Sequence, residues 1–194
     1  MSFYRSSRRV FAWLVVGLTL AVSACGFQLQ GASPLPFDTL LVSVPENTQF
    51  GADLRRAIRA SSPDTVILND AIDPYQAQLQ QISSTRTSRQ VSLNAQGRVE
   101  EYELNLTYVF RIIDANGNII LPATTLSVVR NLPFDDRVVQ AKEGEQATLF
   151  AQMENSLIAR IMRRISAPDI EVRYRALSTT SSADDSNAAS SRTP

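Results

Sequence analysis

VEEYELNLTYVFRII, residues 99–113, alternates apolar and polar side chains along most of its length. A period of two is typical of a β-strand with one buried face and one face in water. The apolar side chains are Tyr102, Leu104, Leu106, Tyr108, Phe110 and Ile112, and the polar ones are Glu101, Glu103, Asn105, Thr107 and Arg111. At ~3.3 Å per residue such a strand spans on the order of 50 Å. Because a domain of this size needs less, we expect one end to project together with a hairpin of residues 86–97.

Turn sequences bound this strand on both sides. Asn94-Ala95-Gln96-Gly97 predicts the tip of the hairpin before it, and Asn116-Gly117 predicts a tight turn after it, since both residues tolerate positive φ. The preceding strand, residues 75–93, carries Ile82 out of phase with its other apolar residues, which predicts a bulge. The following strand, residues 119–131, contains Pro122 and is therefore expected at an edge of the sheet.

The first part of the fold reads as a strand followed by a helix. Residues 39–44 are a continuous β-rich apolar run, which is typical of a strand buried on both faces. Residues 50–59 place apolar side chains at helical spacing, with Asn47 or Thr48 as the cap. This order implies a crossover that brings a later strand beside the first. Residues 66–68 fit either that short returning strand or a buried loop.

A second amphipathic helix is predicted from about Ala147 to Ile165, and Pro168 marks its end. From Leu177 onward small and polar residues dominate, so residues 177–194 are expected to be a disordered tail. The predicted fold is an α/β sandwich with two helices on one face of a four-stranded mixed sheet. Its other, wet face is the obvious surface for a partner.

Composition excludes several classes of function. The chain has 19 basic and 19 acidic residues, which does not suggest a nucleic-acid binder. It has no histidine, so the commonest general base and metal ligand is missing, and we expect no enzyme, no cofactor and no metal site. We read the paired carboxylates as solvated charges because nothing else marks a cleft beside them; they are Glu100/Glu101, Asp135/Asp136 and Asp184/Asp185.

The N-terminus is typical of an exported protein. Arg5, Arg8 and Arg9 precede an apolar run, residues 10–22, that is shorter than the ~20 residues a membrane-spanning helix needs. A basic head, a short apolar middle and small residues at the end indicate a secretory signal peptide.

The only cysteine follows this run directly. Val22-Ser23-Ala24-Cys25 resembles a bacterial lipobox, which implies cleavage after Ala24 and acylation of Cys25 by a diacylglycerol and a further acyl chain. Two or more chains anchor a protein stably to a bilayer. Gly26, in place of a retention aspartate, indicates the outer membrane. The expected organisation is signal peptide 1–24, acylated tether 25–37, α/β domain 38–176 and tail 177–194; the alternative is an ordinary signal peptide with an incidental cysteine.

Four features together resemble the family of LPS-assembly lipoproteins called LptE. They are Cys25-Gly26-Phe27, the strand-linked helix with Phe50 and Ile58, Gly97 to Tyr102 before the long strand, and residues 141–146, Ala-Lys-Glu-Gly-Glu-Gln. The resemblance covers almost the whole chain after the signal peptide. It implies a non-enzymatic protein on the periplasmic side of the outer membrane, which plugs a large LptD-type β-barrel and binds lipopolysaccharide.

The resemblance also implies basic contact residues for lipopolysaccharide. Lys142 matches one such position, but Ala95 stands at the hairpin tip where a basic residue is expected. Arg98, Arg89 or Arg86 are candidates to substitute for it, because a planar guanidinium binds phosphate in a bidentate manner. For each of these four residues the competing interpretation is a solvated surface charge.

Two other classes of function stay open. A free envelope lipoprotein would bind another periplasmic protein or the cell wall by adding a strand at the Pro122 edge. An anchored hydrolase is disfavoured by the missing histidine and by the absence of a glycine-rich loop.

Overall fold

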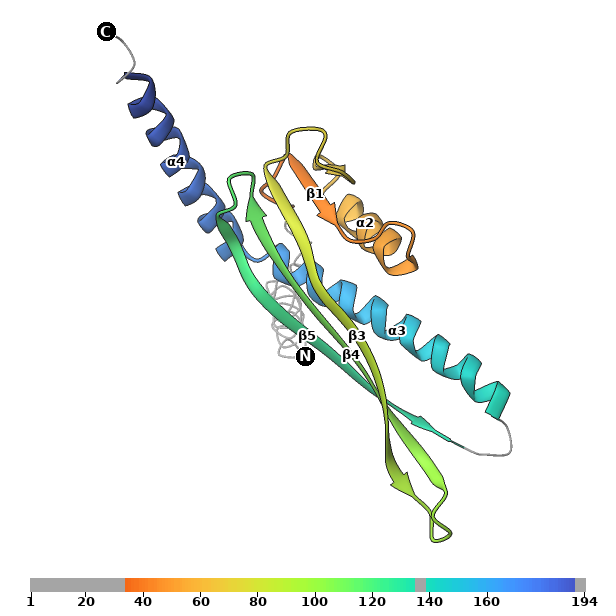
Figure 1. Ribbon diagram of the computed structural model, residues 1–194. Coiled ribbons are helices and arrows are strands. Elements are labelled where there is room, and N and C mark those ends of the chain that lie inside the picture. Colours follow the sequence, from red (N-terminus) through yellow and green to blue (C-terminus); the bar gives the residue numbers. More distant parts are fainter. Residues whose placement is uncertain (1–33, 135–138, 191–194) are drawn as a thin grey trace, which may run out of the picture. The chain divides into compact units, whose positions relative to one another are not determined.

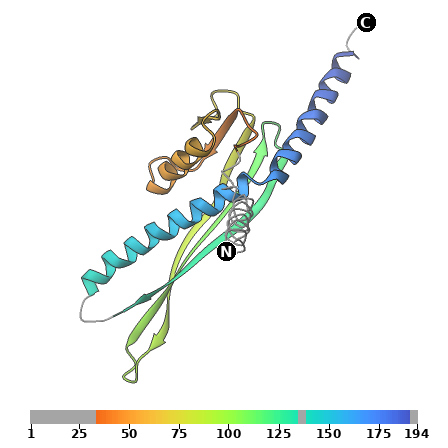
Figure 2. The same ribbon diagram turned by 180° about the vertical axis from the view of Figure 1, so that it is seen from behind.

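The computed structural model describes residues 34–134 and 139–190, with side chains for 34–134 and 144–180. Every described element belongs to one compact unit of the chain, residues 32–194. Figures 1 and 2 show its strands and helices. The elements are β1 Thr39–Ser43, α2 Gln49–Ser61, β2 Val66–Leu68, β3 Ala77–Leu93, β4 Val99–Asp114, β5 Ile119–Pro133, α3 Val139–Ile165 and α4 Pro168–Ser190.

The five strands form one mixed sheet in the order β2-β1-β3-β4-β5. β1 pairs in parallel with both β2 and β3, and the long strands β3, β4 and β5 are antiparallel. The α/β class, the mixed sheet and the crossover between β1 and β2 through α2 are confirmed. The prediction of four strands is one too few, because residues 66–68 also form a strand. It pairs with β1 in a register that places Val66 opposite Thr39. The described residues also include a third helix, α4, beside the two expected.

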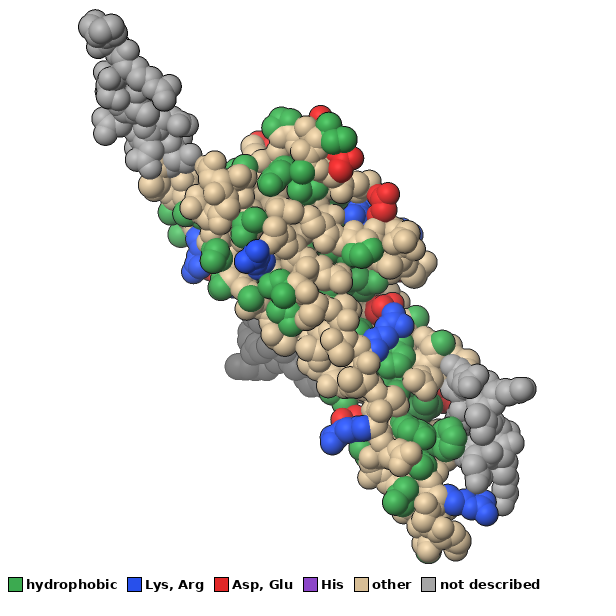
Figure 3. All heavy atoms as spheres, in the orientation of Figure 1, with side chains coloured by type: hydrophobic (Ala, Val, Ile, Leu, Met, Phe, Trp, Pro, Cys, Tyr) green, Lys and Arg blue, Asp and Glu red, His purple; other side chains and the backbone are tan. Residues whose placement is uncertain are grey.

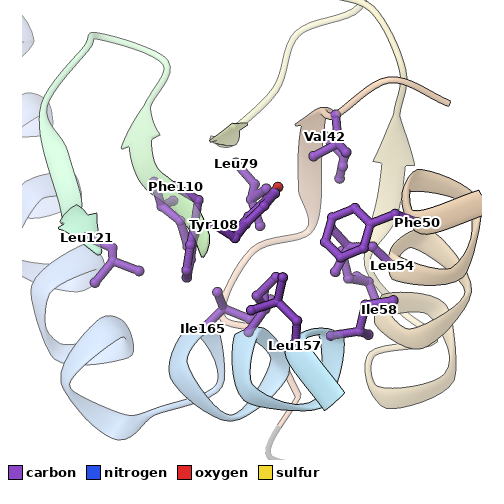
Figure 4. Packing of buried hydrophobic residues seen from close by; sticks show 14 of the residues in the cluster. Val42, Phe50, Leu54, Ile58, Leu79, Tyr108, Phe110, Leu121, Leu157 and Ile165 are labelled. Atoms are coloured by element: carbon purple, nitrogen blue, oxygen red, sulfur yellow. The ribbon is translucent and has the colours of Figure 1, made fainter. Parts of the chain in front are cut away.

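The core lies between the sheet and the helices α2 and α3. Leu104, Leu106, Tyr108, Phe110 and Ile112 of β4 are each 0–1% exposed, which confirms the predicted inner face. Figure 4 shows side chains from both helices pointing toward this row, among them Leu54, Ile58, Leu157 and Ile165. Burial of such side chains is the main favourable term in folding, at ~25 cal/mol per Å² of apolar surface removed from water.

Both predicted hairpin turns are present and share one design. Gly97 (φ 77°) and Gly117 (φ 87°) are the described residues with positive φ. In each turn an Asx side chain, Asn94 or Asp114, accepts two backbone N–H bonds across the loop. Asn116 does not adopt positive φ, so the second turn rests on Gly117 alone rather than on both residues of the Asn-Gly pair. A type I turn closed by a left-handed glycine is a common form of three-residue hairpin.

Two expected irregularities of the sheet are confirmed. The register between β3 and β4 shifts between Gln81 and Ser83, so Ile82 is the bulged residue. β5 is an edge strand, and its register shifts where Thr124 and Leu121 pair with Phe110 and Ile112, which leaves Pro122 in the irregular segment. A proline here removes no donor from the interior of the sheet.

Arg55 fastens α2 to the end of β1. The residue is 5% exposed, and its guanidinium donates to the carbonyl oxygens of Val42 (2.9 Å), Val44 (2.7 Å) and Gly51 (3.1 Å), and to Asn69 Oδ1 (2.9 Å). Burial lowers the pKa of Arg55 from its ordinary value. Four hydrogen bonds compensate the removal of this charge from water.

Helix α4 differs from the sequence prediction. Its first turns pack on the domain: Ile170 is 1% exposed, and the Tyr174 ring meets Phe37 edge to face at 4.9 Å. The helix runs on through Leu177, where we expected the disordered tail to begin, and ends at Ser190. Small residues with little apolar content read as disorder, but they are also compatible with a helix that other contacts have already started. None of the described helices is long and apolar enough to cross a bilayer.

Substituting Gly51 tests the close approach of the loop before α2 to that helix. A Cβ at Gly51 would lie 2.1 Å from the carbonyl oxygen of Pro45, whereas one at Gly144 would meet nothing within 4 Å. We expect Gly51→Ala to lower the free energy of unfolding by about 1–3 kcal/mol through overpacking. The matched variant Gly144→Ala should raise it by up to about 1 kcal/mol through helix propensity. Urea unfolding of both variants measures these changes. Equal changes in the free energy of unfolding for the two variants would contradict the close approach.

Tyr108 offers a second test of the core. Its hydroxyl is buried without a hydrogen-bond partner, and burial raises the pKa of this phenol. A buried hydroxyl without a partner costs about 1–3 kcal/mol in proteins. Tyr108→Phe should therefore keep the free energy of unfolding unchanged or raise it by about 1 kcal/mol, measured by urea unfolding. A loss above about 1 kcal/mol would show that the hydroxyl is satisfied in solution.

Candidate functional site

The face of the sheet opposite the helices carries most of the polar side chains of the long strands. We call it the open face, and it comprises Gln78, Gln80, Thr85, Thr87 and Arg89 of β3, Glu103, Asn105, Thr107 and Arg111 of β4, and Thr125, Ser127 and Val129 of β5. The register pairs Thr87 with Asn105 and Asn105 with Val129, so these rows share one side. The predicted wet face is thus mainly polar, although Val109, Ile113 and Val129 also lie on it.

Hydrogen bonds between neighbouring side chains organise the open face. Gln78 Nε2 donates to Ser43 Oγ at 2.6 Å, Gln80 Nε2 to Gln78 Oε1 at 2.8 Å, and Arg111 Nε to Gln80 Oε1 at 2.7 Å. This row runs across β1, β3 and β4. The open face is therefore polar and also ordered by its own contacts.

A second group on the open face centres on Asn105. Its Oδ1 accepts from Ser127 Oγ at 2.8 Å and from Thr107 Oγ1 at 3.4 Å, which links β4 to β5. Side chains already held by neighbours lose less rotamer entropy when a partner arrives. Such a surface suits contact with another hydrophilic wall.

Arg89 lies on the open face and pairs with the residue directly opposite it. Its Nε donates to Glu103 Oε1 at 2.7 Å. This hydrogen bond lowers the pKa of Glu103 and raises that of Arg89. The Arg89 side chain is 71% exposed. An anion that binds Arg89 would compete with Glu103.

Arg86 lies on the other side of the sheet. It pairs in register with Leu106 of the buried row, so it faces the helices. Its Nη2 donates to Glu154 of α3, and its guanidinium carbon lies 5.3 Å from the centre of the Phe150 ring, a cation–π distance. Arg86 and Arg89, two of the candidate basic residues, therefore lie on opposite faces of the sheet.

The remaining predicted site residues are Arg98, Lys142 and Cys25. Arg98 follows the hairpin tip, where its backbone N–H donates to Asn94 Oδ1 at 2.9 Å. Lys142 lies in the first turns of α3, but its side chain is outside the described residues, and so is Cys25. In Figure 3 blue and red side chains lie next to each other over the projecting hairpin of β3 and β4, which we call the arm. No continuous blue patch appears on this face.

Arg86 separates two hollows on the helix side of β3. One, of about 210 Å³, is lined by Pro45, Thr48, Gln49, Phe50, Gln81, Ser84, Arg86 and Glu154. The other, of about 350 Å³, is lined by Arg86, Gln146, Ala147 and Phe150. The contact of Phe150 and Glu154 with Arg86 was not predicted from the sequence. Their spacing of four residues places both on one side of the helix, which is the signal that the sequence holds.

No group of three or more His, Cys, Asp or Glu side chains among the described residues is placed to hold a metal ion. The surfaces that the described structure offers for contact with a partner include the open face, the tip of the hairpin and the two hollows lined by Arg86.

Comparison with known proteins identifies the family. The model of the family described as LptE, Lipopolysaccharide-assembly, matches residues 37–165. The LPS-assembly lipoprotein LptE of Pectobacterium atrosepticum is 28% identical over 155 residues, which are 78% of this chain and 83% of that protein.

Solved structures agree with this fold. The solution structure of an uncharacterized lipoprotein B from Nitrosomonas europaea has a TM-score of 0.61 at 31% identity, covering 73% of this chain and 91% of that one. The rare lipoprotein B of Shewanella oneidensis has a TM-score of 0.58 at 21% identity, covering 69% and 98%, and supports the fold alone. From the match over residues 37–165, the chain belongs to the LptE family of lipopolysaccharide-assembly proteins.

Proposed function

We propose that this protein is an outer-membrane lipoprotein that assembles with an LptD-type β-barrel, plugs its lumen and binds lipopolysaccharide on its way to the outer leaflet. Family membership and the names of the relatives, which are lipoproteins, support the lipopolysaccharide-assembly role. The protein acts by binding and positioning, and it catalyses no reaction. Cys25, acylated, holds it on the periplasmic side of the outer membrane.

The polarity of the open face supports the proposal that the domain lies inside a barrel. The interior of a large transmembrane barrel is polar, so a plug must present a hydrophilic rather than an apolar surface to it. The open face offers amide, hydroxyl and paired ionic groups such as those of Gln80, Asn105 and the Arg89–Glu103 pair. An exposed apolar sheet face would instead call for a second hydrophobic layer.

The proposed lipopolysaccharide contacts are Arg98, Arg89, Arg86 and Lys142. Arg98 lies beside the tip of the projecting hairpin, while Arg89 and Arg86 lie on either face of the same arm. Phosphates of lipid A would replace Glu103 and Glu154 as the partners of Arg89 and Arg86, in bidentate geometry.

The alternative of strand addition at the Pro122 edge receives less support. Carbonyl oxygens along that edge already accept hydrogen bonds from this chain: Thr124 Oγ1 donates to Pro122 at 2.9 Å, and Arg160 Nη1 donates to Ser127 at 2.7 Å. A partner strand would have to displace both side chains. This edge is protected in the manner of natural sheet edges.

Copurification tests the proposed assembly. The full-length acylated protein, extracted from outer membranes in mild detergent, should elute in a one-to-one complex with a barrel of far larger mass. Native mass spectrometry of the eluted particle gives the stoichiometry. A protein that elutes alone under conditions that leave other outer-membrane complexes intact would contradict the proposal.

Charge reversal tests the lipid contacts. Arg98→Glu combined with Lys142→Glu should weaken lipopolysaccharide binding more than tenfold, because each hydrogen bond to a charged group contributes about 1.5–3 kcal/mol. Binding is measured with purified complex and labelled lipopolysaccharide. Arg59→Glu combined with Arg163→Glu, the same charge change on exposed positions of α2 and α3, is the control. Equal affinities for both double variants would remove Arg98 and Lys142 from the site.

Replacing the cysteine tests the anchor. Cys25→Ala should abolish acylation, seen as the loss of the lipid mass, and should release the protein from membranes of cells depleted of the barrel. Ser23→Ala keeps a small residue before the cleavage position and should remain acylated. Membrane retention of the Cys25→Ala protein in the absence of the barrel would show that something other than lipid holds it.

A further inference from the structure

β3 has a long edge that no strand of the described chain covers. β1 pairs with it only from Ala77 to Gln80, whereas β4 pairs with it along its whole length. From Ile82 to Val91 every residue of β3 is exposed. The register is regular from Ser83 to Gln90, between two bulges. Successive residues of a strand turn their main-chain groups to alternate sides, so about half of those groups in Ser83–Gln90 face this edge.

The two edges of the long strands are treated differently. On β5, side chains of the protein itself occupy main-chain carbonyls, and Pro122 interrupts the donors. On the β3 edge the described side chains form no such caps: Arg86 and Arg89 are turned toward Glu154 and Glu103 instead. The sequence there is rich in Ser and Thr and has no proline, so no proline stops the edge from pairing with an incoming strand.

The two hollows on either side of Arg86 lie along the same segment. The smaller one begins at Pro45, just past the end of β1, and includes Gln81 and Ser84 of β3. The larger one continues from Arg86 to Phe150. In a strand laid along β3, side chains on one face recur every ~6.6 Å. Successive side chains of such a strand would enter the two hollows, which is how strand addition combines main-chain affinity with side-chain selectivity.

We propose that the Ser83–Gln90 edge of β3 is a strand-addition site for an extended segment of the barrel partner, so the inference rests on the proposed function. The added strand continues the line of β1, which already pairs with the first residues of this edge. Wall strands of a closed barrel are fully paired, so the segment comes from a loop or a terminal extension. It presents small or apolar side chains to Phe50 and Phe150 and polar ones beside Thr85 and Thr87.

A second copy of this chain fits the edge less well. Pairing two copies through Ser83–Gln90 in antiparallel fashion would bring Arg86 and Arg89 of each chain beside those of the other. Like charges at neighbouring cross-strand positions are destabilising. A segment of a different protein does not bring these arginines beside one another.

Amide hydrogen exchange tests the site in the full-length protein, alone in detergent and in the purified barrel complex. In the complex, the amides of Ser83–Gln90 that face the free edge should exchange at least about tenfold more slowly, in an alternating pattern, because they have gained hydrogen bonds. Amides of Thr125 to Val129 on the β5 edge are the matched control, since Thr87 and Val129 flank Asn105 from opposite sides. Their rates should change much less.

Three results would overturn the inference. Unchanged exchange of Ser83–Gln90 in an intact complex rejects strand addition but leaves the barrel assembly standing. Equal slowing at both edges indicates exclusion of solvent without strand pairing. Protection already present in the protein alone, together with a dimeric mass, makes a second copy the occupant. Failure to form any complex instead counts against the proposed function.

Discussion

The alternating side chains of β4 constrain the rest of the structure. β4 is paired on both sides over most of its length, with β3 from Val99 to Asp114 and with β5 from Glu101 to Ile113. A shift of one residue in either pairing would turn the buried row Leu104, Leu106, Tyr108, Phe110 and Ile112 toward water. The helices pack on that row, and the polar row is left for contact with something outside the domain. One strand thus separates the side that stabilises the fold from the side available for binding.

The N-terminal third supports this arrangement by a different interaction. The buried Arg55 links α2 to the carbonyls of Val42 in β1 and Val44 just after it, and Gly51 lets the preceding loop contact the helix at Pro45. Together they fix where β1 stops pairing with β3. The length of free edge on β3, and the hollow beside it, follow from that stop.

Strong local patterns made much of the fold predictable. The alternation of β4, the Asx and glycine residues of both turns, Thr48 as the cap of α2 and the apolar stripe of α3 each specify one local structure. The three residues of β2 are too few to show a period, and their strand depends on β1. α4 begins with contacts of Ile170 and Tyr174 to the domain, and the composition of the helix does not predict these contacts.

The candidate site was harder to predict, for a specific reason. Ile82 signalled a bulge, but a bulge also reverses which residues face the helices. Counted from Leu79 without it, Arg89 would face inward and Arg86 outward; the shift between Gln81 and Ser83 exchanges them. Positions on a strand beyond an irregularity cannot be assigned to a face by counting, so the pairs Arg86–Glu154 and Arg89–Glu103 required the structure.

The most direct test of the claim that the open face of the sheet serves binding rather than folding is to add bulk to the open face alone. Thr107→Arg combined with Thr125→Arg adds two large side chains to the open face. We expect the free energy of unfolding to stay within about 0.5 kcal/mol per substitution of that of the parent protein, and the one-to-one barrel complex to be lost on copurification. A complex that forms normally with a fully folded double variant would contradict it.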